Sequence, residues 1–192
     1  MLLRKVIISG TACHTEHLAF QDNFAGIEKW GLAWSKYYRN YDLVFDLHPF
    51  DVNRKQVPED YEKRLLELEH KLMTIYPVAE YPFSTIFPIR KVSKCIGRNY
   101  FLSSLAYMVA YAIYCEYTTI YIQGMDFMIW DVVEAKQIAN IEYLIGLAEG
   151  RGIEVIVDPV CDLLENPYMY GYHWNTQVAT MPHIQKTTLL VD

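Results

Sequence analysis

Between residues 104 and 157, helix-like and strand-like patterns alternate along the chain. A helix beginning at Ser104 is followed by the strand Thr118–Gln123, by a helix over 132–149 and by the strand Ile153–Val157. Both strands are almost continuously apolar, and both helices carry an apolar face. This alternation is typical of a parallel sheet that helices cover on both faces.

The N-terminal part of the chain adds three more strand patterns, which are Arg4–Ser9, the weaker Ile27–Ala33, and Asp42–Leu47. The stretch 58–73 predicts a helix, because Pro58 suits its first turn and regularly spaced leucines form an apolar face. A short strand is predicted over Ile75–Ala79, and the prolines at 82 and 88 mark a loop-rich segment that would serve as a lid.

These patterns together predict an α/β protein with a Rossmann-like, three-layer α/β/α architecture and a mostly parallel sheet. The chain has 192 residues, which fits one domain. We assign residues 1–172 to this domain and expect residues 173–192 to form a polar C-terminal tail, or an arm onto a neighbouring subunit.

Composition limits the classes of partner. The net charge is −6, so we expect no broad basic surface for nucleic acid, although a phosphate needs only a few local donors. No apolar run is long enough for a membrane span, and the first residues lack the layout of a signal peptide, so we expect a cytoplasmic protein. The four cysteines have no zinc-like spacing and predict reduced thiols. The 16 tyrosines are compatible with a homo-oligomer.

Ligands of a doubly wound sheet bind at the carboxyl ends of the strands. The first loop at this edge contains Gly10, which allows a sharp turn, and Thr11, whose hydroxyl and neighbouring N–H groups would hold a phosphate. The loop is neither a GxGxxG fingerprint nor a P-loop, which disfavours ordinary NAD binding and kinase-type ATP binding. The alternative is a plain strand-to-helix turn.

His48 follows the strand Asp42–Leu47 directly. At this position a histidine would contact a ligand, act as a general acid or base, or simply cap the sheet edge. Ser103 and Ser104 begin the next helix pattern, where two hydroxyls and free N–H groups form an anion site. The alternative for this pair is an ordinary helix N-cap, which is compatible with ligand binding.

Gly124 and Asp126 follow the strand Thr118–Gln123. The glycine allows close approach of a ligand, and the carboxylate would accept hydrogen bonds from ribose or sugar hydroxyls. Gln137 belongs to a polar group near the start of the helix over 132–149, which is either ligand-binding or a solvated first turn. No cluster of metal ligands is present, so the sequence requires no cofactor, but Mg²⁺ bridging phosphates and one carboxylate such as Asp126 is compatible with it.

Two segments resemble a known family. KVIISG (residues 5–10) and FLSSLAYMVAYAIYCEYTTIYIQGMDF (residues 101–127) are similar to the strand–Gly loop, Ser/Ser helix start and strand-x-Gly-hydrophobic-Asp pattern of bacterial CMP-sialic acid-dependent sialyltransferases. The same pattern occurs in Rossmann-like proteins that include archaeal 6-hydroxymethylpterin diphosphokinases. The resemblance implies that Gly10, Thr11, Ser103 and Ser104 bind a cytidine nucleotide. The first loop departs from the family, because it has Thr11-Ala12-Cys13 where the family has an Asn/Gly-Pro-Ser run.

The chain also resembles small proteins encoded by tailed bacteriophages over most of residues 4–172. The shared segments are WGL (30–32), FDLHP (45–49), SSLAYM (103–108), EYLIGLAEGRGI (142–153) and YGY (170–172). The catalytic histidine of the sialyltransferases has no assigned counterpart, and His48 and His173 are the candidates by their nearness to loops.

Three functional hypotheses follow. The first is a transferase that uses a nucleotide-activated donor for glycosyl or phosphoryl transfer, with His48 as acid or base and Asp126 as the second catalytic candidate. The second is a non-enzymatic protein that sequesters a nucleotide, as a phage counter-defence protein would. The third is an interaction protein that has lost its ligand. Chemical change of a bound ligand separates the first from the second, and ligand-induced stabilisation separates both from the third.

Overall fold

The computed structural model describes residues 3–12, 14–48, 60–125, 132–161 and 163–164. Within these residues seven strands form one sheet in the order β5-β4-β3-β2-β1-β6-β7. All the pairings are parallel. The strands are β1 (Lys5–Ser9), β2 (Glu28–Leu32), β3 (Leu43–Asp46), β4 (Leu72–Thr74), β5 (Thr85–Ile86), β6 (Thr119–Gln123) and β7 (Glu154–Val157). The predicted α/β fold with a mostly parallel sheet is therefore confirmed.

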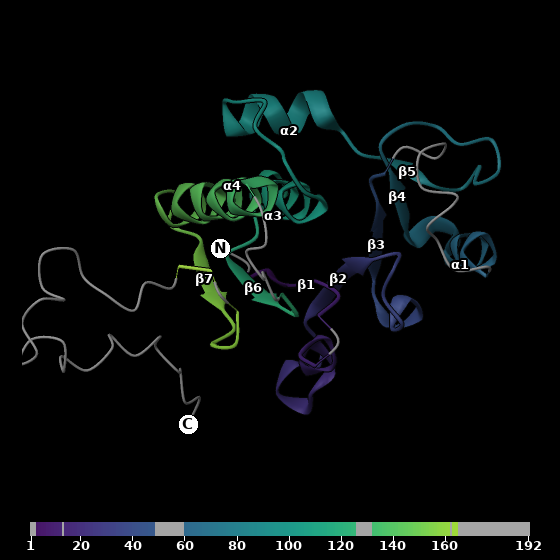
Figure 1. The fold of residues 1–192 in the computed structure, drawn as a ribbon, viewed down its shortest axis with the longest axis horizontal. Coiled ribbons are helices and arrows are strands. Elements are labelled where there is room, and N and C mark those ends of the chain that lie inside the picture. The colour runs from purple at the N-terminus through teal and green to yellow at the C-terminus, as the bar shows by residue number, and fades with distance from the viewer. Residues whose placement is uncertain (1–2, 13, 49–59, 126–131, 162, 165–192) are drawn as a thin grey trace, which may run out of the picture.

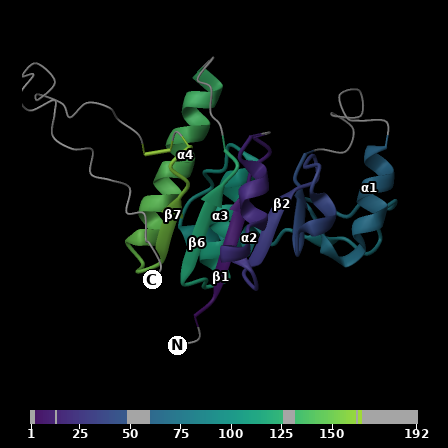
Figure 2. The ribbon, with the colours of Figure 1, turned by 90° about the horizontal axis from the view of Figure 1, so that it is seen from below.

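One face of the sheet is covered by α3 (Ser104–Tyr114) and α4 (Val132–Glu149), and α2 (Ile89–Ile96) lies outside these two helices (Figure 1). The opposite face carries α1 (Tyr61–Leu68) and the short 3-10 helices η1 (Glu16–Phe20), η2 (Asp22–Phe24) and η3 (Tyr38–Asn40). Figure 2 shows the central strands side by side and running in one direction, so their carboxyl ends meet at one edge.

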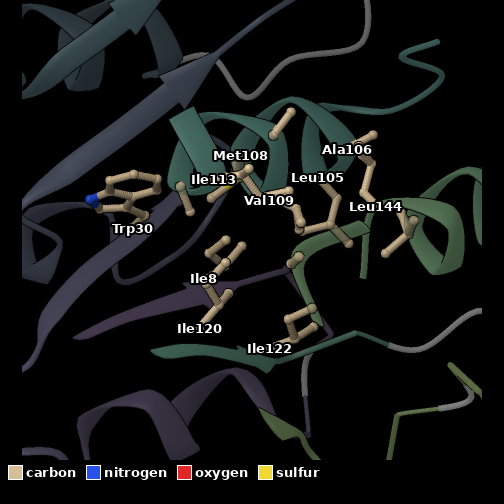
Figure 3. Close-up of a cluster of buried hydrophobic side chains, with 14 of the residues drawn as sticks. Ile8, Trp30, Leu105, Ala106, Met108, Val109, Ile113, Ile120, Ile122 and Leu144 are labelled. Atoms are coloured by element: carbon tan, nitrogen blue, oxygen red, sulfur yellow. The ribbon is translucent and has the colours of Figure 1, made fainter. Parts of the chain in front are cut away.

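The larger core lies between the sheet and α3 and α4. Apolar side chains of the central strands, such as Ile8 and Ile122, face Met108 and Val109 of α3 and Leu144 of α4 (Figure 3). All of these side chains are at most 1% exposed. Burial of such side chains from water stabilises the fold by about 1.5–3 kcal/mol each, which explains why the central strands β1 and β6 are mostly apolar.

A second core lies on the other face, beneath α1. It is rich in tyrosines and leucines, including Tyr41, Tyr61 and Leu65. The ring of Tyr41 packs against Gly31 of β2 so closely that a Cβ atom at residue 31 would lie 2.1 Å from a ring carbon. Gly31 weakened the strand pattern in the sequence, but here it makes room for a buried aromatic ring.

The region after residue 60 differs most from the prediction. The predicted helix over 58–73 is too long, because α1 ends at Leu68 and Glu69 adopts a positive φ of 47°. A 3-10 turn η4 (Glu69–Lys71) and strand β4 follow, so Leu72 is buried as a strand residue rather than on a helix face. Residues 58 and 59 lie outside the described residues.

The strand predicted over Ile75–Ala79 is wrong, because the strand ends at Thr74 and the chain then turns. The segment predicted as a lid between the prolines at 82 and 88 contains the edge strand β5. Helix α2 follows it and was not predicted, because only Val92 and Ile96 of its residues are buried and a longer apolar stripe is lacking.

None of the helices in the described ranges combines the length and the apolar character that crossing a membrane requires. The predicted boundary at residue 172 and the tail 173–192 lie outside the described residues. Of the cysteines predicted to be reduced, Cys95, Cys115 and Cys161 are free thiols in the described part of the chain.

Candidate functional site at the carboxyl edge of the sheet

The strand order reverses at β1. The chain proceeds from β1 to β2 and onward to β5 on one side, and returns to place β6 on the other side of β1. The helices that follow β1 and β6 in the described residues, η1 and α4, lie on opposite faces of the sheet. Such a switch point is where α/β sheets bind ligands. The described residues that flank this switch point are Gly10 after β1 and Gly124 after β6.

Gly10 and Gly124 are in direct backbone contact. A Cβ atom at Gly10 would lie 2.3 Å from the carbonyl oxygen of Gly124, so a side chain there would force the two loops apart. Gly124 has a φ of +66°, which an L-residue with a side chain rarely adopts. The structure thus brings together two residues that the sequence singled out for a nucleotide site.

The first loop uses much of its backbone to hold this contact. The N–H of Gly10 donates to the carbonyl of Gln123 at 2.9 Å, and the N–H of Ala12 donates to the carbonyl of Gly124 at 2.9 Å. These two N–H groups are therefore engaged, which narrows the predicted phosphate-binding role of the loop to the exposed Thr11. Asp126 lies outside the described residues.

The N-terminus of α3 faces the same edge, because α3 leads into β6 and packs against β1. Ser103 is its N-cap, and its hydroxyl accepts a hydrogen bond from the N–H of Ala106 at 3.2 Å. The N-cap alternative is thus confirmed for Ser103. Ser104 is half-buried and begins the first turn of the helix, whose dipole favours an anion.

Asn140 of α4 fixes the segment that precedes this turn. Its side chain is fully buried; its carbonyl oxygen accepts from the N–H of Leu102 at 2.8 Å, and its amide donates to the carbonyl of Tyr100 at 2.9 Å. Gln137 lies three residues earlier on the same side of α4, one turn closer to the carboxyl edge, and is half-buried. The helix spacing therefore places Gln137 toward the Ser103–Ser104 turn.

His48 lies at the end of β3, two strands away from β1 and therefore about 10 Å from it. Its Nδ1 lies 3.7 Å from the Asp46 carboxylate, and the His48 side chain is 44% exposed. Asp46 thus faces one ring nitrogen, while the other, Nε2, remains to accept or donate a proton. The structure does not bring His48 into the Gly10–Gly124 contact.

Two aromatic residues complete the surroundings of His48. The ring of Trp34 lies 6.1 Å from that of His48 and 5.4 Å from that of Tyr61. The indole N–H of Trp34 and the hydroxyl of Tyr61 are buried, and neither forms a hydrogen bond in the described part of the chain. Burial, and then the negative charge of nearby Asp46, raise the pKa of Tyr61, although Asp46 is not placed to accept its proton in a well-formed hydrogen bond.

A buried polar cluster lies beneath the first loop. Glu16 of η1 is 2% exposed, and its carboxylate accepts hydrogen bonds from the hydroxyls of Ser35 and, at 3.4 Å, Tyr41. Burial and the Glu16 charge raise the pKa of Tyr41 to about 12, although hydroxyl contacts oppose the increase. A Cβ atom at Gly124 would lie 3.2 Å from the Cα of Glu16, so this cluster directly supports the switch point.

The sequence did not predict Glu16, Trp34 or Tyr61 as site residues. The contact of Asp46 with His48 had one signal in the sequence, which is that His48 follows the last residue of β3 by only two positions. The positions of Glu16 and Tyr61 depend on tertiary packing. Among the described residues no three His, Cys, Asp or Glu side chains gather where they would hold a metal ion.

The fold and its switch point define a Rossmann-like α/β protein. Among solved structures the chain is similar to the sialyltransferase CstII from Campylobacter jejuni in complex with a substrate analogue, CMP-3FNeuAc. The two share 16% sequence identity over 83% of this chain and 81% of that chain, with a TM-score of 0.52. This similarity shows a shared fold.

Further similarities are to a CstII complex with cytidine-5'-monophosphate from the same organism, with 17% identity, coverage of 81% of this chain and 79% of that chain and a TM-score of 0.46. The monofunctional alpha-2,3-sialyltransferase Cst-I from Campylobacter jejuni has 17% identity, coverage of 83% and 76%, and a TM-score of 0.38. No family model and no curated protein matches the sequence.

Proposed function

We propose that this protein is a glycosyltransferase that uses a nucleotide-activated sugar. The observation that carries the proposal is the switch point, where the close contact of Gly10 with Gly124 holds the ends of β1 and β6 together at the same edge as the N-terminus of α3. Ligands of α/β sheets bind at such a switch point, and the helix N-terminus favours the charge of a phosphate. CMP and a CMP-sugar analogue are the ligands of the similar CstII structures.

In the proposed site, Thr11, Ser104 and Gln137 hold the nucleotide, and Asp126 accepts hydrogen bonds from its sugar hydroxyls. The phosphate lies at the first turn of α3, where negative charge grows as the donor bond breaks.

The proposed reaction needs one general base. The acceptor hydroxyl oxygen attacks the anomeric carbon of the donor sugar, and a new C–O bond forms. The bond from that carbon to the phosphate oxygen breaks, and its electron pair leaves with the nucleotide. The hydroxyl proton passes to Nε2 of His48, while Asp46 stabilises the resulting imidazolium through Nδ1.

The first test is a thermal-shift screen of nucleoside mono-, di- and triphosphates, sugar nucleotides and cyclic dinucleotides, each with and without Mg²⁺. Any stabilising ligand is then recovered and chromatographed. We expect a sugar nucleotide to raise the melting temperature and to be recovered hydrolysed or transferred. Recovery of an intact ligand would favour a sequestering protein instead, and no shift with any compound would contradict the proposal.

The Ser104→Glu variant tests the phosphate position. A carboxylate in the first turn of α3 would repel the phosphate while remaining favourable for the helix itself. We therefore expect loss of the nucleotide-induced shift with the melting temperature of the free protein retained. Undiminished nucleotide binding by this variant would remove Ser104 from the site.

A further inference from the structure

A pocket of about 500 Å³ lies beside α4, lined by Arg98, Asn99, Tyr100 and Tyr143. Its volume is within the range of small-molecule sites. The guanidinium of Arg98 lies 5.8 Å from the ring centre of Tyr143, and the rings of Tyr100 and Tyr143 meet edge to face at 5.9 Å. The pocket therefore presents one cation, one amide and two aromatic rings.

The segment Arg98–Tyr100, which forms one wall of this pocket, is fixed at both of its ends. Gly97 ends α2 with a φ of 80°, which turns the chain into the Arg98–Tyr100 segment. The guanidinium of Arg151 donates to the carbonyl of Cys95 at 2.7 Å and secures the end of α2. On the other side the buried Asn140 holds the carbonyl of Tyr100. Because the Asn140 side chain is fully buried and both of its hydrogen bonds go to this surface segment, the segment is held in one conformation.

The surroundings of the pocket are basic in an otherwise acidic protein. Residues 81–115 contain no Asp or Glu, whereas the protein has a net charge of −6. Helix α2 exposes Arg90, Lys91 and Lys94, and buries Val92 and Ile96 instead. Arg98 is exposed and pairs with no carboxylate of the described residues, so its charge is available to a ligand.

We propose that this pocket binds a saccharide that bears a carboxylate, and that this saccharide is the acceptor of the transferase. The guanidinium of Arg98 pairs with the carboxylate, because arginine matches its planar, two-oxygen geometry. The Tyr100 and Tyr143 rings pack against the C–H face of the sugar ring, and the Asn99 amide bonds its hydroxyls.

The position of the pocket suits an acceptor. Tyr100 is three residues from the α3 cap Ser103, so at most about 10 Å of chain separates the pocket wall from the proposed phosphate position. An oligosaccharide held at Arg98 is therefore long enough to reach the proposed donor position. The role of the saccharide as an acceptor rests on the proposed function. The binding of an acidic saccharide is argued from the residues of the pocket alone.

The test measures binding by calorimetry to the full chain. The probes are di- and trisaccharides that end in glucuronic, galacturonic or N-acetylneuraminic acid, each beside a neutral counterpart that lacks the carboxylate. We expect at least one acidic probe to bind and its neutral counterpart to bind about ten- to hundredfold more weakly, the loss typical of a charged hydrogen bond.

Three variants localise the binding. Arg98→Gln should remove the preference for the acidic probe, and Tyr143→Ala should weaken both members of a pair. Arg90→Gln is the matched control, since it removes one exposed cation of α2 outside the pocket and should change affinity less than about twofold. An equal loss of affinity for the acidic probe in Arg90→Gln and Arg98→Gln would show that a diffuse basic surface binds the probe, and it would overturn the proposal.

The two proposals fail separately. If no acidic probe binds while a sugar nucleotide still shifts the melting temperature, the pocket proposal is wrong and the transferase proposal stands. If acidic probes bind through Arg98 but no nucleotide does, the transferase proposal is wrong and the chain is a binder of acidic saccharides. Retention of nucleotide binding by Arg98→Gln is expected, because Arg98 lies outside the proposed nucleotide site.

Discussion

At the scale of single residues, Gly31 shows how a side chain's absence shapes the fold. The Tyr41 ring occupies the space over β2 that a Cβ atom at Gly31 would need, and its hydroxyl thereby reaches the buried carboxylate of Glu16. A glycine within a strand otherwise weakens it. Gly31 therefore lowers the strand propensity of β2 but makes room for a buried tyrosine, which contacts Glu16 beneath the loop after β1.

The Gly31→Ala variant should destabilise the protein by about 1–3 kcal/mol, because an added methyl group would overlap the Tyr41 ring. The free energy of unfolding in urea measures the effect. Gly146→Ala is the control: Gly146 lies within α4, and a methyl group there would meet no atom within 4 Å. This variant should gain up to about 1 kcal/mol from helix propensity. Equal stability of both variants would contradict the packing of Tyr41 on Gly31.

The buried Tyr41 and the half-buried Tyr111 make the stability of the protein depend on alkaline pH. Burial, and for Tyr111 also the neighbouring Cys115, raise the pKa of Tyr41 and Tyr111 from 10.0 to about 12. Between these values the unfolded chain loses these protons and the folded chain keeps them, so folding stability falls as pH rises. Below pH 10.0 this contribution is fully present.

The free energy of unfolding should therefore decrease as pH rises from 10.0 toward about 12. Urea titrations across this interval measure the slope, and phenolate absorbance reports which tyrosines ionise. Tyr41→Phe should flatten part of the slope, although it also removes the hydrogen bond to Glu16. A phenolate spectrum in which all the tyrosines ionise together near pH 10.0 while the protein remains folded would contradict these pKa directions.

At the scale of elements, α4 both covers the sheet and holds the segment before α3. The side chain of Asn140 supplies hydrogen-bond partners to the carbonyl of Tyr100 and the N–H of Leu102. The helix thereby joins the wall of the saccharide pocket to the turn that carries Ser103 and Ser104. Both proposed subsites depend on one buried amide.

Asn140→Ala should destabilise the protein by about 1–3 kcal/mol, because it removes a buried side chain and its hydrogen bonds to the N–H of Leu102 and the carbonyl of Tyr100. It should also weaken the binding of acidic saccharides, because the wall at Tyr100 loses its support. Lys136→Ala, an exposed change on the same helix, should alter stability by less than about 0.5 kcal/mol. Chemical denaturation measures the stability of both variants, and calorimetry measures their saccharide affinity. Wild-type stability of Asn140→Ala would contradict the stabilising role of the Asn140 hydrogen bonds.

The elements predicted well from the sequence are those whose pattern is long or strongly apolar. Strands β1, β3, β6 and β7 and helix α4 were predicted in place because continuous apolar runs and one clear helical period identify them. The stretch around Leu68 and Leu72 was assigned wholly to a helix, since apolar residues four apart fit that period. The structure separates helix α1 from strand β4 by the positive φ of Glu69 and by the pairing of β4 with β3.

The candidate site was predictable only in part for a similar reason. Gly10, Gly124 and the serines at the start of α3 follow from the rule that loops after parallel strands meet at one edge. The buried donors of Trp34 and Tyr61 and the carboxylate of Glu16 come from turns and short helices that no periodic pattern marks. Their positions result from packing between distant segments.

At the scale of the whole molecule, the proposed donor and catalytic positions follow different strands of one sheet. His48 lies two residues beyond the end of β3, and the Gly10–Gly124 contact follows β1 and β6, so that β2 lies between the two positions. The pairing of these strands sets the spacing of the strand ends from which the residues continue. Changes at His48 should affect chemistry without affecting nucleotide affinity.

His48→Gln should lower turnover of a sugar nucleotide by about 10²- to 10⁴-fold, the contribution typical of a general base, with nucleotide affinity unchanged. Asp46→Asn should lower turnover less, because it removes the carboxylate beside Nδ1 but leaves the imidazole in place. Steady-state rates, together with binding measurements, separate effects on turnover from effects on nucleotide affinity. Full turnover by His48→Gln would assign the base to another residue.

The central place of β1 has a consequence for how the chain is made. β1 pairs with β2 soon after both leave the ribosome, but its other edge waits for β6, as the Arg4–Thr118 hydrogen bond across 114 residues illustrates. At common rates of synthesis that interval is roughly 6–23 seconds. During it the newborn chain carries an apolar strand with an unpaired edge, which makes the middle of the finished sheet the part most in need of a chaperone while the protein is being translated.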